Sequence, residues 1–230
     1  MEEPIAAALF GSGVYEPDTL AAILSRLPAD GIYVDVGANV GAIALPVAAQ
    51  RPGAKVVCVE AAPEIAVILR RNVEENARSN IAVVECVAGS EENPISFYGA
   101  PASKFGMGSI GPQFDALPLT LEQRTLDGVL DELGIGNVDV VKLDIEGAEL
   151  GALRGIMRRL TSSHRPAIVF EFSDWAEARV GGQKPGDAQA YLVSIGYRLF
   201  RLGRGGLPGP ALDSPITSGS GMILGVPLKS

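Results

Sequence analysis

Short runs of β-branched and other apolar residues alternate along the chain with longer segments of helical periodicity. The strand-like runs cover residues 31–36, 55–60, 80–87, 137–144, 167–172, 197–202 and 222–226. Helical patterns lie between them, over about 41–50, 63–77, 147–160 and 188–194. Strands that alternate with helices are typical of a parallel sheet covered on both faces. The pattern therefore predicts a doubly wound, mostly parallel α/β sheet.

Two segments interrupt the alternation. Residues 99–118 are rich in Gly, Pro and Ser, follow a short strand pattern at 95–98, and exceed the usual length of a structureless loop. We expect a lid-like insertion over a pocket there. Residues 203–221 have a similar composition and are expected to form a surface connection within a final β-hairpin. We expect residues 1–30 to form a helical segment that packs on the core of one domain spanning 31–230.

Charge and cysteine content limit the partners of the chain. The 230 residues include 19 Lys and Arg and 27 Asp and Glu, which give a net charge of −8. Nucleic acids and anionic membranes bind largely through Lys and Arg, so we expect neither as a partner. Cys58 and Cys86 lie within apolar runs and form no disulfide framework, which indicates a reducing, cytoplasmic location. The sequence does not determine the oligomeric state, and a homo-oligomer is one of the alternatives.

The residue types present exclude several kinds of catalytic site. The chain has one histidine, His164, so a zinc site with several histidines is impossible. A hydrolase triad would need His164, which precedes a predicted strand, whereas α/β active sites lie at the carboxyl ends of strands. We expect a structural role for this residue. The sequence also has no P-loop motif, which argues against a phosphotransferase of that class.

A glycine-containing turn, residues 34–41 (VDVGANVG), joins the first strand to the first helix. Gly37 allows a close turn under a ligand, Gly41 lets the helix approach the strand, and the helix start offers N–H groups to a carboxylate. Asp35 would repel a pyrophosphate but suits an ammonium group. S-adenosylmethionine carries an ammonium group and a carboxylate but no phosphate. We therefore assign Asp35, Gly37, Asn39 and Gly41 to this cofactor; a structural turn without a ligand is the alternative.

Glu60 ends the second strand, where a carboxylate can accept hydrogen bonds from both hydroxyls of a ribose. Nicotinamide cofactors use the same interaction, so an NAD-dependent oxidoreductase remains an alternative. The third strand ends in small residues, and we assign Ala88 to contact with the adenine.

A second polar segment, residues 142–149 (KLDIEGAE), follows the fourth strand. Lys142 and Asp144 point to the same face of an extended strand. A lysine and carboxylates that converge on a pocket are typical of an acid/base or orienting cluster. Glu149 falls in the first turn of the next helix, where the helix dipole favours a carboxylate.

Together the two motifs resemble the FkbM-type methyltransferases, and the resemblance covers about residues 13–227. Further shared features are Tyr15-Glu16-Pro17, Gly108-Ser109-Ile110, Thr125-Leu126-Asp127, Glu171 and the segment 223–227. The resemblance implies a seven-stranded, Rossmann-like class I fold. It also implies S-adenosylmethionine-dependent methylation, commonly of a hydroxyl on a sugar or another small molecule.

The polar residues of the second motif supply the candidate catalytic groups. Asp144 is our first candidate for the base that deprotonates the acceptor hydroxyl. Lys142 or Glu146 would orient the acceptor, with Glu171 across the pocket mouth. Lys142 is the alternative base if burial lowers its pKa. A divalent metal held by Asp144, Glu146 and Glu171 is a further alternative, and we assign no metal ligand.

Two residues outside this motif, Glu16 and Ser109, are assigned to contact with the acceptor. A protein that binds S-adenosylmethionine without catalysing transfer remains an alternative function.

Overall fold

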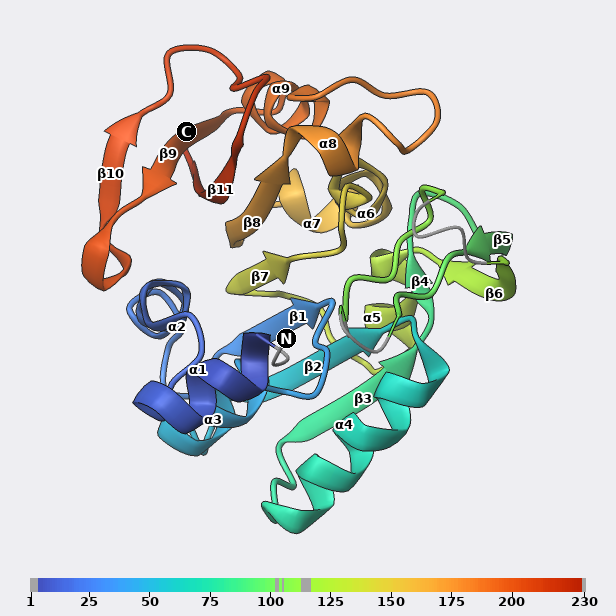
Figure 1. Cartoon of the computed structure of the whole chain (residues 1–230). Helices are drawn as coiled ribbons and strands as arrows, with labels where there is room; N and C mark the ends of the chain where they lie inside the picture. Colours follow the sequence, from blue (N-terminus) through green and yellow to red (C-terminus); the bar gives the residue numbers. More distant parts are fainter. Residues whose placement is uncertain (1–3, 102–103, 105, 113–116, 229–230) are drawn as a thin grey trace.

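The computed structural model describes residues 4–101, 104, 106–112 and 117–228. Its main sheet has eight strands in the spatial order β10-β9-β11-β8-β7-β1-β2-β3 (Figure 1). The strands are β1 (Ile32–Val36), β2 (Lys55–Glu60), β3 (Ile81–Glu85), β7 (Val140–Leu143), β8 (Ala167–Ser173), β9 (Tyr197–Leu202), β10 (Pro208–Ala211) and β11 (Ser220–Pro227). Five neighbouring strands run parallel to one another, in the order β3, β2, β1, β7 and β8. Strand β11 lies between β8 and β9 and is antiparallel to both. The predicted doubly wound fold class is confirmed.

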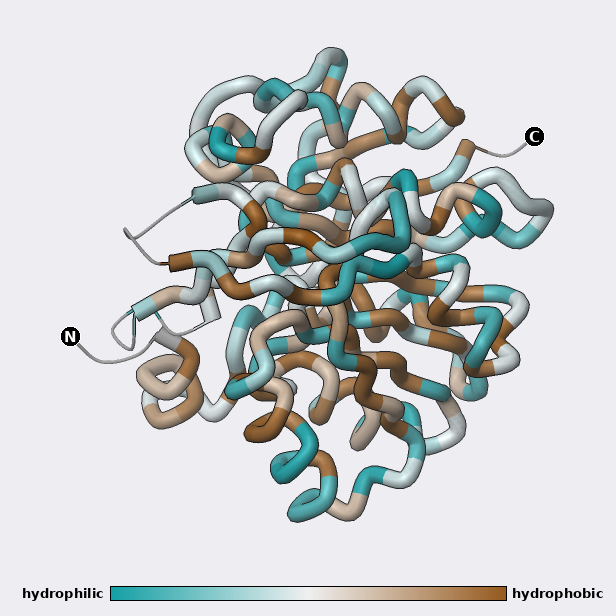
Figure 2. The backbone as a smooth tube through the Cα atoms, turned by 90° about the vertical axis from the view of Figure 1, so that its right-hand side faces the viewer, coloured by the Kyte–Doolittle hydropathy of each residue, from teal (hydrophilic) through white to brown (hydrophobic). Residues whose placement is uncertain are grey.

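Helices cover both faces of this sheet. They are α2 (Pro17–Leu24), α3 (Ala44–Gln50), α4 (Pro63–Glu75), α5 (Leu126–Glu132), α6 (Glu149–Gly155), α7 (Met157–Leu160), α8 (Asp174–Glu177) and α9 (Asp187–Ser194). Alternate strand residues enter two cores: Tyr33 and Cys58 pack with α2 and α3, whereas Val34 and Val57 pack with α5 and α6. Figure 2 shows the hydrophobic segments crossing the interior. The side-chain alternation of strands thus produces the layered fold.

A small second sheet lies beside the main one, in the strand order β4-β6-β5 (Figure 1). It consists of β4 (Val87–Ala88), β5 (Asn93–Phe97) and β6 (Leu119–Arg124). The insertion at 99–118 connects β5 to β6. An isolated antiparallel bridge joins Ser109 of the insertion to Tyr98, which directly precedes it. Residues 102–103, 105 and 113–116 of the expected lid lie outside the described residues.

The N-terminal segment contains α1 (Pro4–Ser12) and α2. Leu20 and Ile23 of α2 are buried against the sheet. The short helix η2 (Arg204–Gly206) lies against α2, where the Gly205 N–H donates to Asp18 at 2.8 Å. Two segments distant in sequence therefore meet at this edge. No helix among the described residues is both long and apolar enough to cross a lipid bilayer.

Several boundaries differ from the sequence-based expectation. The strand expected over 80–87 is divided between β3 and β4, which belong to different sheets. The connection at 203–221 contains β10, which pairs with β9 and adds an edge strand to the seven expected ones. His164 lies beside the amino end of β7, where its Nε2 is 2.9 Å from Asp139 Oδ1, as expected for a structural residue.

Candidate active site

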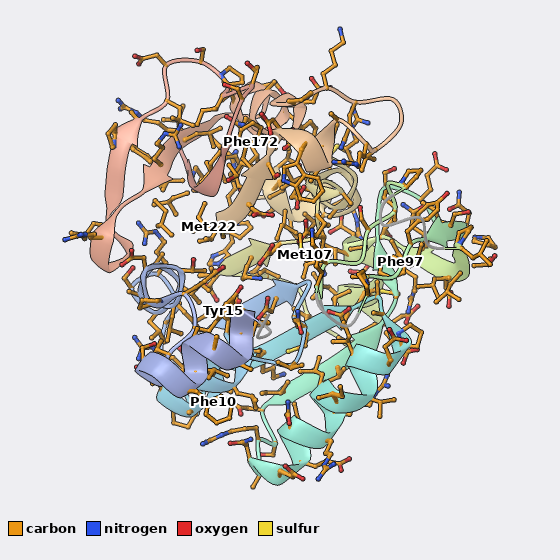
Figure 3. All side chains as sticks on the ribbon, viewed as in Figure 1. Phe10, Tyr15, Phe97, Met107, Phe172 and Met222 are labelled. Carbon is orange, nitrogen blue, oxygen red and sulfur yellow. The ribbon has the colours of Figure 1, made fainter. Side chains whose placement is uncertain are left out.

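A cavity of about 260 Å³ lies at the carboxyl ends of β1, β2, β7 and β8. Its walls come from these strand ends, the N-terminal segment and the second sheet; Tyr15 lies on the N-terminal side and Phe97 on the side of the second sheet (Figure 3). Most of the residues assigned from the sequence line it, namely Glu16, Asp35, Gly37, Asn39, Glu60, Ala88, Lys142, Asp144, Glu146 and Glu171. Gly41 and Ser109 are not among the described residues that line it.

Lys142 is the buried cation of this cavity. It lies directly opposite Asp35 in the register of β1 and β7, and its side chain is 3% exposed. Its Nζ is 3.4 Å from Asp35 Oδ1 and 3.3 Å from Asp144 Oδ2. The predicted convergence of Lys142 and Asp144 on one face is therefore confirmed.

The environment of Lys142 opposes its use as a base. Burial alone lowers the pKa of this ammonium, but the negative charges of Asp144, Asp35 and Glu16 outweigh burial, so the pKa lies above its ordinary value. A lysine held as a cation cannot accept a proton. This environment gives no support to the alternative in which burial converts Lys142 into a base.

Asp35 presents a buried carboxylate to the cavity. Its side chain is 1% exposed, and the groups that stabilise its charge are the Lys142 ammonium and the Tyr33 hydroxyl. Burial raises the pKa of Asp35 against the opposing charge of Lys142. Buried charges are costly unless they are paired, so this side chain suits a ligand that supplies a second cation.

The glycine turn is packed tightly between its neighbours. Gly37 has a φ of 74°, and a Cβ placed on it would lie 2.0 Å from the Asp144 carbonyl oxygen. The Asp144 N–H donates to the Val36 carbonyl at 3.1 Å, which fixes the two motifs against each other. Only glycine fits this combination of left-handed backbone and close approach.

Two details of this turn correct the sequence-based expectation. Gly41 has a φ of 89° and faces Leu69 and Leu45, so it serves helix packing rather than the cavity. The backbone N–H groups of residues 37–41 all have acceptors within the protein, namely Val59, Glu60, Asn39 and Ala38. Residues 37–41 therefore offer no free N–H groups to a ligand carboxylate, whereas the expectation for the helix start concerns the next residues, of which Ala42 and Ile43 line the cavity.

Glu60 occupies the end of β2 as expected. Its Oε2 accepts from the Asn39 N–H at 2.8 Å and its Oε1 from the Ala62 N–H at 2.9 Å. Burial raises its pKa although both hydrogen bonds act in the opposite direction. A carboxylate has about four acceptor positions, so two remain available toward the cavity for hydroxyl donors. Cys86, Val87 and Ala88 form an apolar wall of the same cavity.

Three further carboxyl groups, of Asp144, Glu146 and Glu171, line the cavity. Burial, reinforced by the charge of Glu171 and then of Asp144, raises the pKa of Glu146 to about 8. Burial and the Asp144 charge raise the pKa of Glu171 to about 8 as well. Within the described chain, no group of three or more His, Cys, Asp or Glu residues is arranged to hold a metal ion, so the metal alternative gains no support.

Backbone strain gathers around this cavity. The non-glycine residues with positive φ in the described chain are Glu16, Asn39, Ala77 and Glu146, with φ between 41° and 53°. All except Ala77 line the cavity. Such conformations cost of order 1–3 kcal/mol each and persist where the surroundings enforce them. They are a signal of function that the sequence did not reveal.

Ser109 and Glu149 enforce the conformation of the Glu146 turn. The buried Ser109 hydroxyl donates to the Glu146 carbonyl at 2.8 Å and accepts from the Gly111 N–H at 3.1 Å. Glu149 accepts from the N–H groups of Ile145 and Gly147, at 3.0 and 3.4 Å. The assignment of Ser109 to the acceptor is therefore replaced by a structural one, and Glu149 supports the turn from behind.

Comparison with known proteins identifies the family. Residues 35–199 match the methyltransferase FkbM domain. The chain belongs to the FkbM methyltransferase family. Methyltransferase sdnD of Sordaria araneosa is 28% identical over 77% of this chain and 78% of that protein. The 2-O-methyltransferase NoeI of Sinorhizobium fredii is 25% identical over 72% of this chain and 74% of its own.

A solved structure supports the fold assignment. Precorrin-6y C5,15-methyltransferase from Geobacter metallireducens superimposes with a TM-score of 0.54 at 16% identity, over 91% of this chain and 86% of that chain. The protein is thus an S-adenosylmethionine-dependent methyltransferase with a class I fold, and the family decides against the NAD-dependent oxidoreductase. The cavity fits the implied cofactor, since Asp35 offers a buried carboxylate to its ammonium group and Glu60 retains acceptor positions for its ribose.

We predict that Glu60→Ala weakens S-adenosylmethionine binding tenfold or more, because each lost charge-assisted hydrogen bond contributes about 1.5–3 kcal/mol. The variant should also melt at a lower temperature, since the N–H groups of Asn39 and Ala62 lose their acceptor. Calorimetric titration below the melting temperature measures the affinity. Glu85→Ala is the matched control, because Glu85 occupies the same register on β3 but pairs with Arg70 outside the cavity. Unchanged affinity in Glu60→Ala would contradict the assignment.

We predict that Glu149→Gln stabilises the protein at high pH. Burial raises the pKa of Glu149 from about 4.5 to about 8, so its protonated form favours folding. The contribution of this group to the free energy of unfolding is complete below pH 4.5 and is lost as the pH rises to about 8. Glutamine mimics the protonated carboxyl, and the variant should melt several degrees above the parent protein at pH 9 but near it at pH 5. Equal shifts at both pH values, or a matching gain in the exposed control Glu74→Gln, would refute this account.

Proposed function

We propose that the protein transfers a methyl group to a hydroxyl oxygen of a small-molecule or sugar acceptor. The observation that carries this proposal is the group of carboxylates, Asp144, Glu146 and Glu171, that lines one part of the cavity. A hydroxyl must lose its proton when it is methylated, and such a group supplies a proton acceptor at the site of reaction. The 2-O-methyltransferase activity in the name of NoeI points to the same class of reaction.

The main contribution expected from the chain to catalysis is the alignment of the acceptor hydroxyl with the methyl group. S-adenosylmethionine supplies an activated methyl group whose leaving thioether needs no acid. Asp35, Glu60 and the turn at Gly37 hold the donor, and the acidic part of the cavity holds the acceptor in line with it. Fixing two reactants in this way contributes up to roughly 7–11 kcal/mol to lowering a barrier.

Asp144 is our proposed base. Its side chain is 24% exposed, whereas Lys142 is nearly buried, so its second oxygen can meet an acceptor while the first pairs with the ammonium. The Gly37 turn lies against its backbone, which brings it to the boundary between the two parts of the cavity. Glu146 and Glu171, on neighbouring elements, orient the acceptor. Described residues of the N-terminal segment and of the insertion, such as Ile5, Tyr15 and Met107, complete the lining of the cavity.

The chemistry is tested by product analysis. The parent protein is incubated with S-adenosylmethionine and a panel of sugars and alcohols, release of S-adenosylhomocysteine is measured, and the methylated atom is identified by nuclear magnetic resonance. Methyl ethers support the proposal. Methylation at nitrogen, sulfur or carbon of the same compounds would replace it with another transfer.

We predict that Asp144→Asn lowers single-turnover methyl transfer by about 10²-fold or more, because loss of a general base typically has this effect. Lys142 keeps its pairing with Asp35, so the fold and the S-adenosylmethionine affinity should stay within a few-fold of the parent. Asp213→Asn, an exposed site away from the cavity, is the control. Normal turnover in Asp144→Asn removes this residue from the mechanism, and lost cofactor binding makes it a cofactor ligand.

A further inference from the structure

The charge inside the cavity narrows the chemistry of the acceptor. Six carboxylic acids line it, Glu16, Asp35, Glu60, Asp144, Glu146 and Glu171, whereas Lys142 is the sole lysine or arginine among the described lining residues. Asp35 and Glu60 are accounted for by the cofactor, and the Lys142 ammonium offsets one further charge. The acceptor part of the cavity therefore holds more carboxyl groups than cationic groups.

Glu16 adds a specific observation to this imbalance. It precedes the first turn of α2 with a left-handed φ of 41°, yet its side chain does not cap the helix. It lines the cavity instead, and its buried Oε2 has no hydrogen-bond partner within the described structure. The fully buried Asp35, paired with Lys142, lines the same cavity. A strained backbone thus holds a carboxyl group in the cavity beside Tyr15 and Thr19, with one oxygen that no group of the described chain hydrogen-bonds.

The charged groups around these carboxyl groups are mostly acidic, and Glu16 itself lies near Asp144 and Lys142. Glu146 lies near the charges of Glu171 on β8 and of Asp144 just after β7, and the cation that acts on it is Lys104 of the insertion, an exposed residue. Glu171 faces Asp144, Glu149 and Glu16, with Lys142 as the opposing charge. Carboxylates crowded in this way repel an anionic acceptor and gain most from a cationic one.

The geometry points to an acceptor that carries an ammonium group beside the reacting hydroxyl, as in an amino sugar or another amino alcohol. Glu16, Glu146 and Glu171 would bind the ammonium group, and Asp144 would receive the hydroxyl proton. This inference rests on the proposed O-methylation.

Matched compounds test the preference by binding alone. Protein saturated with S-adenosylhomocysteine is titrated calorimetrically with glucosamine, glucose and glucuronate. The same is done with 2-aminocyclohexanol, cyclohexane-1,2-diol and 2-hydroxycyclohexanecarboxylate. We expect the amine to bind at least tenfold more tightly than the neutral compound in one series or both, and the carboxylate to bind most weakly. No preference for the amine in either series, including no binding of the amines, overturns the inference.

The variant Glu16→Gln links the preference to the cavity. It removes one of the three charges without touching the proposed base, and we expect the preference for the amine to fall at least threefold. Glu64→Gln, an exposed control on α4, should keep the parent preference. An unchanged preference in Glu16→Gln overturns the role of this residue. These titrations measure binding and involve no methyl transfer. If product analysis found methylation on nitrogen, the proposed O-methylation would be refuted, but the preference for a cationic compound would still stand.

Discussion

The buried ammonium of Lys142, paired with Asp35 on β1 and with Asp144 after β7, is the interaction on which the site depends. A buried cation is tolerated only where carboxylates compensate it, and Asp35 and Asp144 share that role. Because β1 and β7 are hydrogen-bonded neighbours in parallel register, the pair is fixed by the sheet itself. The residue therefore couples the part of the cavity that suits the methyl donor to the part that suits the acceptor.

Tight packing and hydrogen bonds around this pair fix the conformation of the segment 144–149. The Gly37 turn leaves no room for a side chain against the Asp144 carbonyl, and Glu146 adopts a left-handed conformation. Hydrogen bonds from Ser109 and to Glu149 hold that turn from two sides. Enclosure also raises the pKa of several carboxyl groups, so the same burial that orders the site makes its charge state responsive to a ligand.

The fold and the central residues of the site were predictable because they depend on local patterns. Strand alternation gave the layered sheet, and the spacing of Lys142 and Asp144 placed both on one face of a strand. The roles of Ser109 and Gly41 were not predictable, since both depend on which segment the fold brings against them. Whether the pKa of Lys142 is raised or lowered likewise depends on the balance between burial and three nearby carboxylates. Only the folded cavity determines that balance. β6 was missed because its pairing with β5 follows a long insertion.

The most direct test of the account is a crystal structure of the protein with S-adenosylhomocysteine. The account predicts that the ribose hydroxyls hydrogen-bond to Glu60 and that the amino group of the ligand lies beside Asp35. The sulfur should then face the boundary at Asp144. A ligand whose ribose lies away from Glu60, or whose amino group points away from Asp35 and Lys142, would contradict the division of the cavity into a donor part and an acceptor part.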